Sequence, residues 1–88
     1  MAVKFSKHFS KQYDKAPGTI RQAFDQRLKL FLHNKFHPQL KNHALEGNLK
    51  GFRSINVTGD WRAIFREVNH GGRIYFDLLG THSQLYGK

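Results

Sequence analysis

The 88-residue sequence contains no cysteine, which excludes disulfide scaffolds, cysteine-ligated zinc, iron–sulfur clusters and thiol catalysis. It also has no apolar run near the ~18–20 residues that a membrane span needs. The first five residues lack the apolar segment of a signal peptide. We therefore expect a protein of the cytoplasm with no segment that crosses a membrane.

Acidic residues are scarce as well. Six Asp and Glu stand against 15 Lys and Arg, and the formal net charge is +9 with histidine neutral. The excess is concentrated in residues 1–41, which carry a net +7, whereas residues 42–88 carry +2. So strong an imbalance on a short chain favours a polyanionic partner, such as a nucleic acid, an anionic membrane or an acidic protein.

The remaining composition is that of a small folded protein. Apolar residues make up 39% of the chain and aromatic residues 14%, which argues against a disordered segment. A chain of this length forms one domain, here residues 1–88, with a small core.

The first third of the chain has helical periodicity. Residues 2–5 are rich in apolar side chains and predict a short strand. Ser6 is placed to cap a helix over residues 6–16, in which aromatic side chains repeat every fourth position and lysines line the opposite face. After a Pro-Gly break, Thr19 is expected to cap a second helix that ends near residue 33.

The periodicity then changes. Residues 34–48 predict a loop with at most a helical turn. Residues 52–57, 61–68 and 73–79 are rich in aromatic and β-branched side chains and are separated by turn sequences, which is typical of hairpin-linked strands. The predicted order is β-α-α-β-β-β, an α+β fold in which a two-helix hairpin packs on a small antiparallel sheet.

Histidine is the residue type best suited to proton transfer near neutral pH. None of the six histidines has HxH or HExxH spacing, so no metal site is expected. His43 and His82 lie at strand boundaries, although spacing alone favours a solvated loop histidine at each position. Asp60 is equally consistent with ordinary turn chemistry or an ion pair with Arg53 or Arg62.

Strand alternation divides the side chains of residues 61–66 between two faces. Trp61, Ala63 and Phe65 share one face, and Arg62, Ile64 and Arg66 the other. The strand arginines are either simply solvated or form a basic surface that binds phosphates, with Trp61, Tyr75 and Tyr86 available for base stacking. Composition and spacing alone thus predict a small basic α+β domain that binds a polyanion, and nothing more specific.

Three stretches in the second half of the chain are more informative. They are His43-Ala44-Leu45-Glu46-Gly47, the segment from Lys50-Gly51-Phe52-Arg53 through Gly59-Asp60-Trp61-Arg62-Ala63-Ile64-Phe65, and Gly80-Thr81-His82-Ser83-Gln84-Leu85-Tyr86. Their combination and order resemble the RelE/ParE superfamily of bacterial toxins, most closely its YafQ branch. The motifs lie within residues 43–87, and the expected order of elements agrees along nearly the whole chain.

The resemblance implies a toxin of a type II toxin-antitoxin system with a RelE-like fold. Toxins of the YafQ type are endoribonucleases that need no metal or cofactor, enter the ribosomal A site and cut mRNA there. A cognate antitoxin wraps the toxin and blocks its site. Two alternatives stay open on the same fold: a non-catalytic inhibitor of DNA gyrase, as in the ParE branch, or a degenerate toxin that only binds its antitoxin.

Carried over by residue, the resemblance implies a catalytic set of His43, Asp60 and His82. It implies substrate-binding roles near the site for Lys50, Arg53, Trp61, Arg62 and Tyr86. The RNA 2′-OH would attack the adjacent phosphorus, with Asp60 or His43 as base and His82 as general acid. The basic side chains would neutralise the charge that develops on the phosphate.

The sequence departs from the YafQ pattern at two positions. Asn56 stands where the pattern has a further histidine, and Leu78 where it has an arginine. An asparagine orients or donates but does not shuttle a proton at neutral pH. A lost phosphate-binding arginine removes a charge-assisted contact worth roughly 1.5–3 kcal/mol. The two changes predict either compensation by neighbouring arginines or a weak nuclease.

Overall fold

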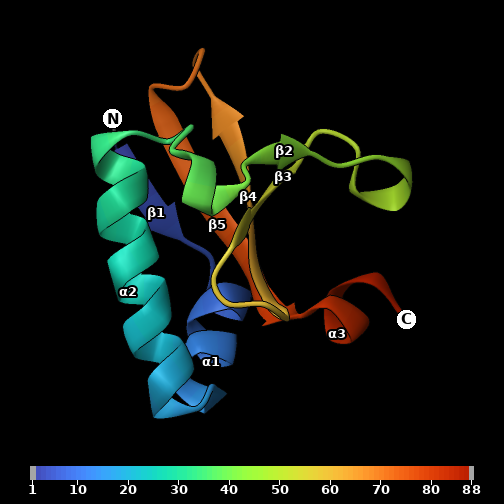
Figure 1. Cartoon of the computed structure of the whole chain (residues 1–88). Helices are drawn as coiled ribbons and strands as arrows, with labels where there is room; N and C mark the ends of the chain where they lie inside the picture. The colour runs from blue at the N-terminus through green and yellow to red at the C-terminus, as the bar shows by residue number, and fades with distance from the viewer. Residues whose placement is uncertain (1, 88) are drawn as a thin grey trace.

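The computed structural model describes residues 2–87. Its helices and strands, in chain order, are β1 (Ala2–Phe5), α1 (Lys7–Lys15), α2 (Gly18–His33), β2 (His43–Ala44), β3 (Arg53–Asn56), β4 (Trp61–Val68), β5 (Arg73–Thr81) and α3 (His82–Tyr86). Figure 1 shows α1 and α2 side by side along the sheet, with α3 and the β2 segment on its other side. No helix within residues 2–87 is long and apolar enough to cross a membrane.

Helix α1 begins as the sequence predicts. The Ser6 hydroxyl accepts a hydrogen bond from the Phe9 backbone N–H at 2.9 Å and donates one to the Asp77 carbonyl at 3.1 Å. The hydroxyl therefore caps the helix and also ties it to β5. Phe9 points into the core, and the three lysines of the opposite face are exposed.

The prediction that Thr19 caps α2 is wrong. The cap lies two residues earlier, because the helix begins at Gly18 and Pro17 occupies the capping position without a side-chain hydrogen bond. The Pro17 carbonyl accepts the first two helical bonds, from the N–H groups of Ile20 and Arg21, at 2.9 and 3.1 Å. The φ of Pro17, −54°, suits the start of a helix, and no side-chain oxygen caps the first N–H groups.

The strands form one sheet in the order β1-β5-β4-β3-β2. The prediction of an antiparallel sheet holds for β2 to β5 but is wrong for β1, which runs parallel to β5 with Phe5 opposite Phe76. After β1, the α1–α2 hairpin carries the chain across to the far edge of the sheet, where β2 lies. The strands β3, β4 and β5 then return across the sheet, so that β5 becomes the neighbour of β1. A parallel pair requires a crossover of this kind, and hairpin turns alone do not supply it.

Two further elements were not predicted. Within the segment 34–48, residues His43–Ala44 form β2, which pairs with β3, beside short 3₁₀ turns. At the other end, β5 continues to Thr81 and leads directly into α3. A two-residue strand and a five-residue helix are too short to produce a recognisable periodicity.

The core lies between the helices and the sheet. Six phenylalanine rings form its centre, with centroids 5.1–6.2 Å apart: Phe5, Phe9, Phe24, Phe31, Phe65 and Phe76. The core-facing side chains predicted for β4 are confirmed, since Trp61, Ala63 and Phe65 pack in this core. Ile64, predicted on the other face, is fully buried as well, next to a register irregularity between Ile64 and Phe65.

Candidate functional site

A groove of about 540 Å³ lies on the sheet face away from the α1–α2 hairpin. Its polar and aromatic lining comes from the β2 segment, β3, β4 and α3: Lys41, His43, Glu46, Asn56, Arg62, His82 and Tyr86. Segments far apart in the chain meet here because β2 and α3 flank the exposed ends of β3 and β4, as Figure 1 shows. The groove is partly open to solvent.

His82 is held at the junction of β5 and α3. Its backbone N–H donates to the Asp60 carbonyl at 2.9 Å. The Thr81 hydroxyl and the Gln84 side chain form a capping box around it, which fixes where the helix begins. The imidazole lies edge-on to the Tyr86 ring, with centroids 4.5 Å apart, so one helical turn presents both rings to the groove.

His43 lies in the short strand β2, across the groove from α3. Its Nδ1 is 2.7 Å from the carbonyl oxygen of Lys41. Because a carbonyl oxygen only accepts, Nδ1 carries the proton in this contact. The neutral imidazole then has its lone pair on Nε2, where it is able to accept a proton.

Arg62 brings a fixed positive charge to the groove. Its Nη1 donates to the carbonyls of Thr58 and Gly59 in the β3–β4 turn, at 3.0 and 3.1 Å. A guanidinium has five N–H donors, so these bonds leave others for a phosphate. Asn56 lies directly opposite Arg62 in the register of β3 and β4 and lines the same groove.

Four of the eight predicted site residues thus line one groove: His43, Arg62, His82 and Tyr86. Asp60 lies next to it in the exposed β3–β4 turn and supports His82 through its backbone carbonyl. Lys50 follows the second 3₁₀ turn and does not line the groove.

Trp61 and Arg53 are directed to the other side of the sheet. Trp61 packs against the core and lines a separate hollow beside the end of α1. The Arg53 Nε donates to the Asn42 side chain at 2.8 Å, and its guanidinium lies 5.8 Å from the Phe36 ring centroid. Strand alternation explains both orientations, because side chains an odd number of residues apart in a strand point to opposite faces. Trp61 is one residue from Arg62, and Arg53 is three residues from Asn56, and Arg62 and Asn56 are the residues of these strands that face the groove.

Sequence reasoning missed two charged residues that line the groove, Lys41 and Glu46. Both flank His43 within three residues, and this proximity was the signal available. Within residues 2–87, no group of three histidine, aspartate or glutamate side chains is arranged to hold a metal ion. The groove combines two imidazoles with two cationic side chains, which are the kinds of group that serve in acid–base catalysis and in the stabilisation of negative charge.

Comparison with known proteins agrees with this architecture. The sequence model of the YafQ family, described as the bacterial toxin of a type II toxin-antitoxin system, matches residues 1–87. The mRNA interferase toxin YafQ of Escherichia coli is 36% identical over 47 residues, which are 53% of this chain and 49% of that protein. The aligned region thus spans about half the length of this curated relative.

Two solved structures share the fold. The crystal structure of YafQ from Escherichia coli has a TM-score of 0.75 and 24% identity, with 97% of each chain covered. The YoeB-YefM complex from Staphylococcus aureus has a TM-score of 0.72 and 17% identity, with 93% of this chain and 97% of that chain covered. These two structures show the fold, and the family match over residues 1–87 shows that the chain belongs to the YafQ family of type II toxin-antitoxin toxins.

Proposed function

We propose that this toxin is a metal-independent endoribonuclease that cuts mRNA on the ribosome. The observation that carries the proposal is the convergence of His43, Arg62 and His82 on one open groove. Two imidazoles and a guanidinium are the groups that cleavage by the RNA's own 2′-OH requires. The curated relative from Escherichia coli is named an mRNA interferase, which supports the same reaction.

In the proposed mechanism, His43 acts as the base. Its Nε2 accepts the 2′-OH proton while Nδ1 stays hydrogen-bonded to the Lys41 carbonyl. The 2′-oxygen then attacks the adjacent phosphorus, and the bond to the 5′-oxygen breaks. Protonated His82 gives its proton to that leaving oxygen. The products are a 2′,3′-cyclic phosphate and a 5′-hydroxyl end.

The remaining groove residues stabilise and orient the reacting phosphate. Arg62 and Lys41 place positive charge where the pentavalent phosphorane becomes more negative. Asn56 donates a hydrogen bond from its amide but does not titrate, so it orients the phosphate. Tyr86 offers a ring face beside His82 for stacking a nucleobase. Asp60 contributes through its backbone by fixing His82.

The partners proposed for this chain are mRNA in the ribosomal A site and a cognate antitoxin. A net charge of +9 suits both a surface of ribosomal RNA and an acidic protein. The related structure from Staphylococcus aureus is a toxin-antitoxin complex of YoeB with YefM, which supports an antitoxin as a partner of this fold. The ribosome supplies the positioning that a shallow, open groove lacks.

The test uses purified protein, translating ribosomes and an mRNA carrying a 5′ label. Wild type, His82→Ala and His8→Ala are compared, because His8 is an exposed histidine on α1 outside the groove. We expect wild type and His8→Ala to release fragments ending in a cyclic phosphate, and His82→Ala to slow cleavage by roughly 10²–10⁴-fold. Equal cleavage by His82→Ala would overturn the assignment.

The same purified proteins, assayed in addition with DNA and gyrase and with the antitoxin, separate the alternative functions. A gyrase inhibitor would leave mRNA intact and stabilise the cleavage complex of DNA with gyrase. A degenerate toxin would do neither and would still bind its antitoxin. Either result would refute the nuclease proposal.

A further inference from the structure

A basic surface with one aromatic ring at its centre lies beyond the groove, on β1, β4 and β5. Its side chains are Lys4, Arg66, Arg73 and Tyr75, and we call this set the β5 patch. The three cationic residues are exposed, and the tyrosine is half-buried. None of the four lines the groove, and the mechanism proposed above uses none of them.

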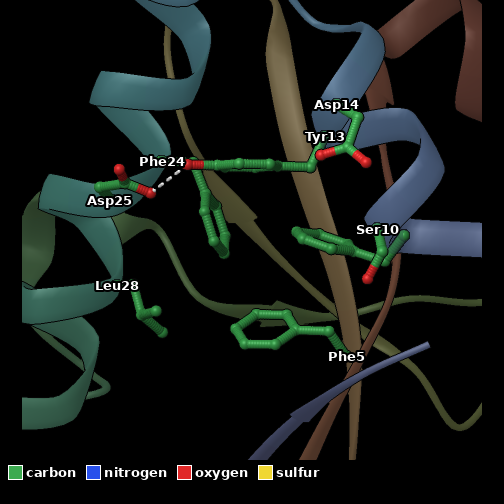
Figure 2. Close-up of a pocket in the computed structure, with 8 residues that line it drawn as sticks. Phe5, Ser10, Tyr13, Asp14, Phe24, Asp25 and Leu28 are labelled. Atoms are coloured by element: carbon green, nitrogen blue, oxygen red, sulfur yellow. Dashed lines mark hydrogen bonds between the residues drawn. The ribbon is translucent and has the colours of Figure 1, made fainter. Parts of the chain in front are cut away.

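Strand register brings these four side chains together. Arg66 of β4 and Lys4 of β1 both lie opposite Tyr75 of β5, one on each side of it. Arg73 precedes Tyr75 by two residues, so its side chain is on the same face of the sheet. Phe5 points toward the two helices, as Figure 2 shows, and strand alternation therefore directs its neighbour Lys4 to the face away from them.

The β5 patch is on the same face of the sheet as the groove. Arg66 follows the groove residue Arg62 by four positions in β4, so the two side chains leave the strand on one face. At about 3.3 Å per residue they are roughly 13 Å apart along the strand. Ile64 lies between them and is fully buried, so the groove and the patch are two separate sites. A stacked nucleic-acid strand advances about 3.4 Å per nucleotide, and about four nucleotides connect the two.

The Arg66–Tyr75 pair at the centre of the patch is held in place by the protein itself. The Arg66 Cζ atom is 4.9 Å from the centroid of the tyrosine ring. The Arg66 Nε donates to the Asp77 carboxylate at 3.3 Å, and the Arg66 side chain is still 47% exposed. This ion pair uses Nε, and the guanidinium has four further N–H donors. A fixed ring beside a flat cation is a surface on which a nucleobase stacks.

We propose that the β5 patch is a second RNA subsite, across which the single strand that enters the groove continues. A nucleobase stacks on the Arg66–Tyr75 pair. Lys4 and Arg73 bind the neighbouring phosphates. The inference rests on the nuclease function proposed above. Charge favours a polyanion, because three cations stand against the one carboxylate of Asp77. The ring favours a single strand, because a duplex buries the faces of its bases.

The experiment measures binding of RNA to the purified protein without ribosomes. The probes are a nine-nucleotide single strand and a three-nucleotide single strand, both methylated at every 2′-oxygen so that they cannot be cleaved. Only the longer one reaches from the groove to the patch. Affinities are measured by fluorescence anisotropy over a series of salt concentrations.

Two patch variants are each compared with a matched control. Tyr75→Leu removes the ring from the patch, and Phe36→Leu removes a ring that is 59% exposed elsewhere on the surface. Arg73→Gln removes one charge from the patch, and Lys29→Gln removes one from an exposed position of α2, on the other face of the sheet. Unfolding curves show that each variant is folded.

We expect Tyr75→Leu to weaken binding of the long RNA by about fivefold or more and to leave its salt dependence unchanged, because stacking involves no counterion. Arg73→Gln should lower the slope of log affinity against log salt concentration by about 0.7, the value for one phosphate contact with a single strand. Both variants should gain less affinity than wild type between three and nine nucleotides. The two controls should match wild type.

Wild-type affinity for the long RNA in both patch variants would overturn the proposal, and so would equal losses for the two lengths. Equal affinity of wild type for a duplex of the same sequence would overturn the stacking role. Loss of antitoxin affinity with unchanged RNA affinity would also overturn the proposal, because the patch would then bind an acidic protein. If wild type binds the long RNA but cuts no mRNA on ribosomes, the nuclease function fails, and the length comparison still decides the role of the patch.

Discussion

Replacement of Phe76 by alanine should remove a large part of the stability of the fold that holds the groove in place. Its ring is fully buried and lies 5.3–5.8 Å, centroid to centroid, from the rings of five other phenylalanines. Truncating a buried phenylalanine to alanine costs about 3–5 kcal/mol. A chain of 88 residues, at roughly 0.05–0.15 kcal/mol per residue, is stable by about 4–13 kcal/mol. The cost is therefore comparable with the whole stability at the lower end of that range.

The matched control is Phe36→Ala, the same change on a ring that is 59% exposed. Phe36 contacts the charged ends of Lys35 and Arg53, at 5.5 and 5.8 Å from its centroid, and such surface contacts are worth less than about 1 kcal/mol. Urea and thermal unfolding, followed by circular dichroism, measure both variants. At about 4–8 °C per kcal/mol, Phe76→Ala should lower the melting temperature by at least about 12 °C. Similar losses for the two variants would refute the proposed location of the core.

Three further changes test individual contacts. Ser54→Ala should raise the free energy of unfolding by about 1 kcal/mol, measured by urea titration, because the buried Ser54 hydroxyl has no hydrogen-bond partner among the described residues. Asn56→His should speed mRNA cleavage in the ribosome assay by at least about tenfold, since it adds a titratable group to the groove; an unchanged rate would show that Asn56 does not face the reacting atoms. The hydrogen bond to Asp25, with burial, raises the pKa of Tyr13 above its ordinary value of 10.0. The contribution of this hydrogen bond to folding stability is therefore complete below pH 10.0 and is lost as the pH rises through the pKa of Tyr13 in the folded state. In a spectrophotometric titration, the tyrosine signal that Tyr13→Phe removes should therefore be one that ionises above pH 10.0, and loss of a signal that ionises at or below that pH would contradict this.

Periodicity predicted the long elements of the fold well. The bounds of β4 at residues 61–68 match the structure, because a run rich in aromatic and β-branched side chains between two turn sequences is a strong signal for a strand. The start of α1 was equally clear, since Ser6 precedes a four-residue repeat. The parallel pairing of β1 with β5 was not predictable in the same way, because it depends on where the helical hairpin returns the chain and not on local pattern.

The site shows a different limit. The motifs that carry the family resemblance contain His43 and His82, and the structure brings both to one groove. The same motifs place Trp61 beside Arg62, yet adjacent residues of a strand point to opposite faces, and only Arg62 lines the groove. Arg53 and Asn56 lie in the same strand, and their side chains point to opposite faces of the sheet for the same reason. A linear motif therefore identifies residues near a site more reliably than it identifies those that face it.

The most direct test of the central claim is the induction of wild type, His82→Ala and His8→Ala in a bacterium, with growth recorded and mRNA 5′ ends mapped. The account predicts that wild type and His8→Ala arrest growth and create new 5′ ends within translated codons, whereas folded His82→Ala does neither. Growth arrest by wild type without new mRNA ends, or undiminished cleavage by His82→Ala, would contradict it.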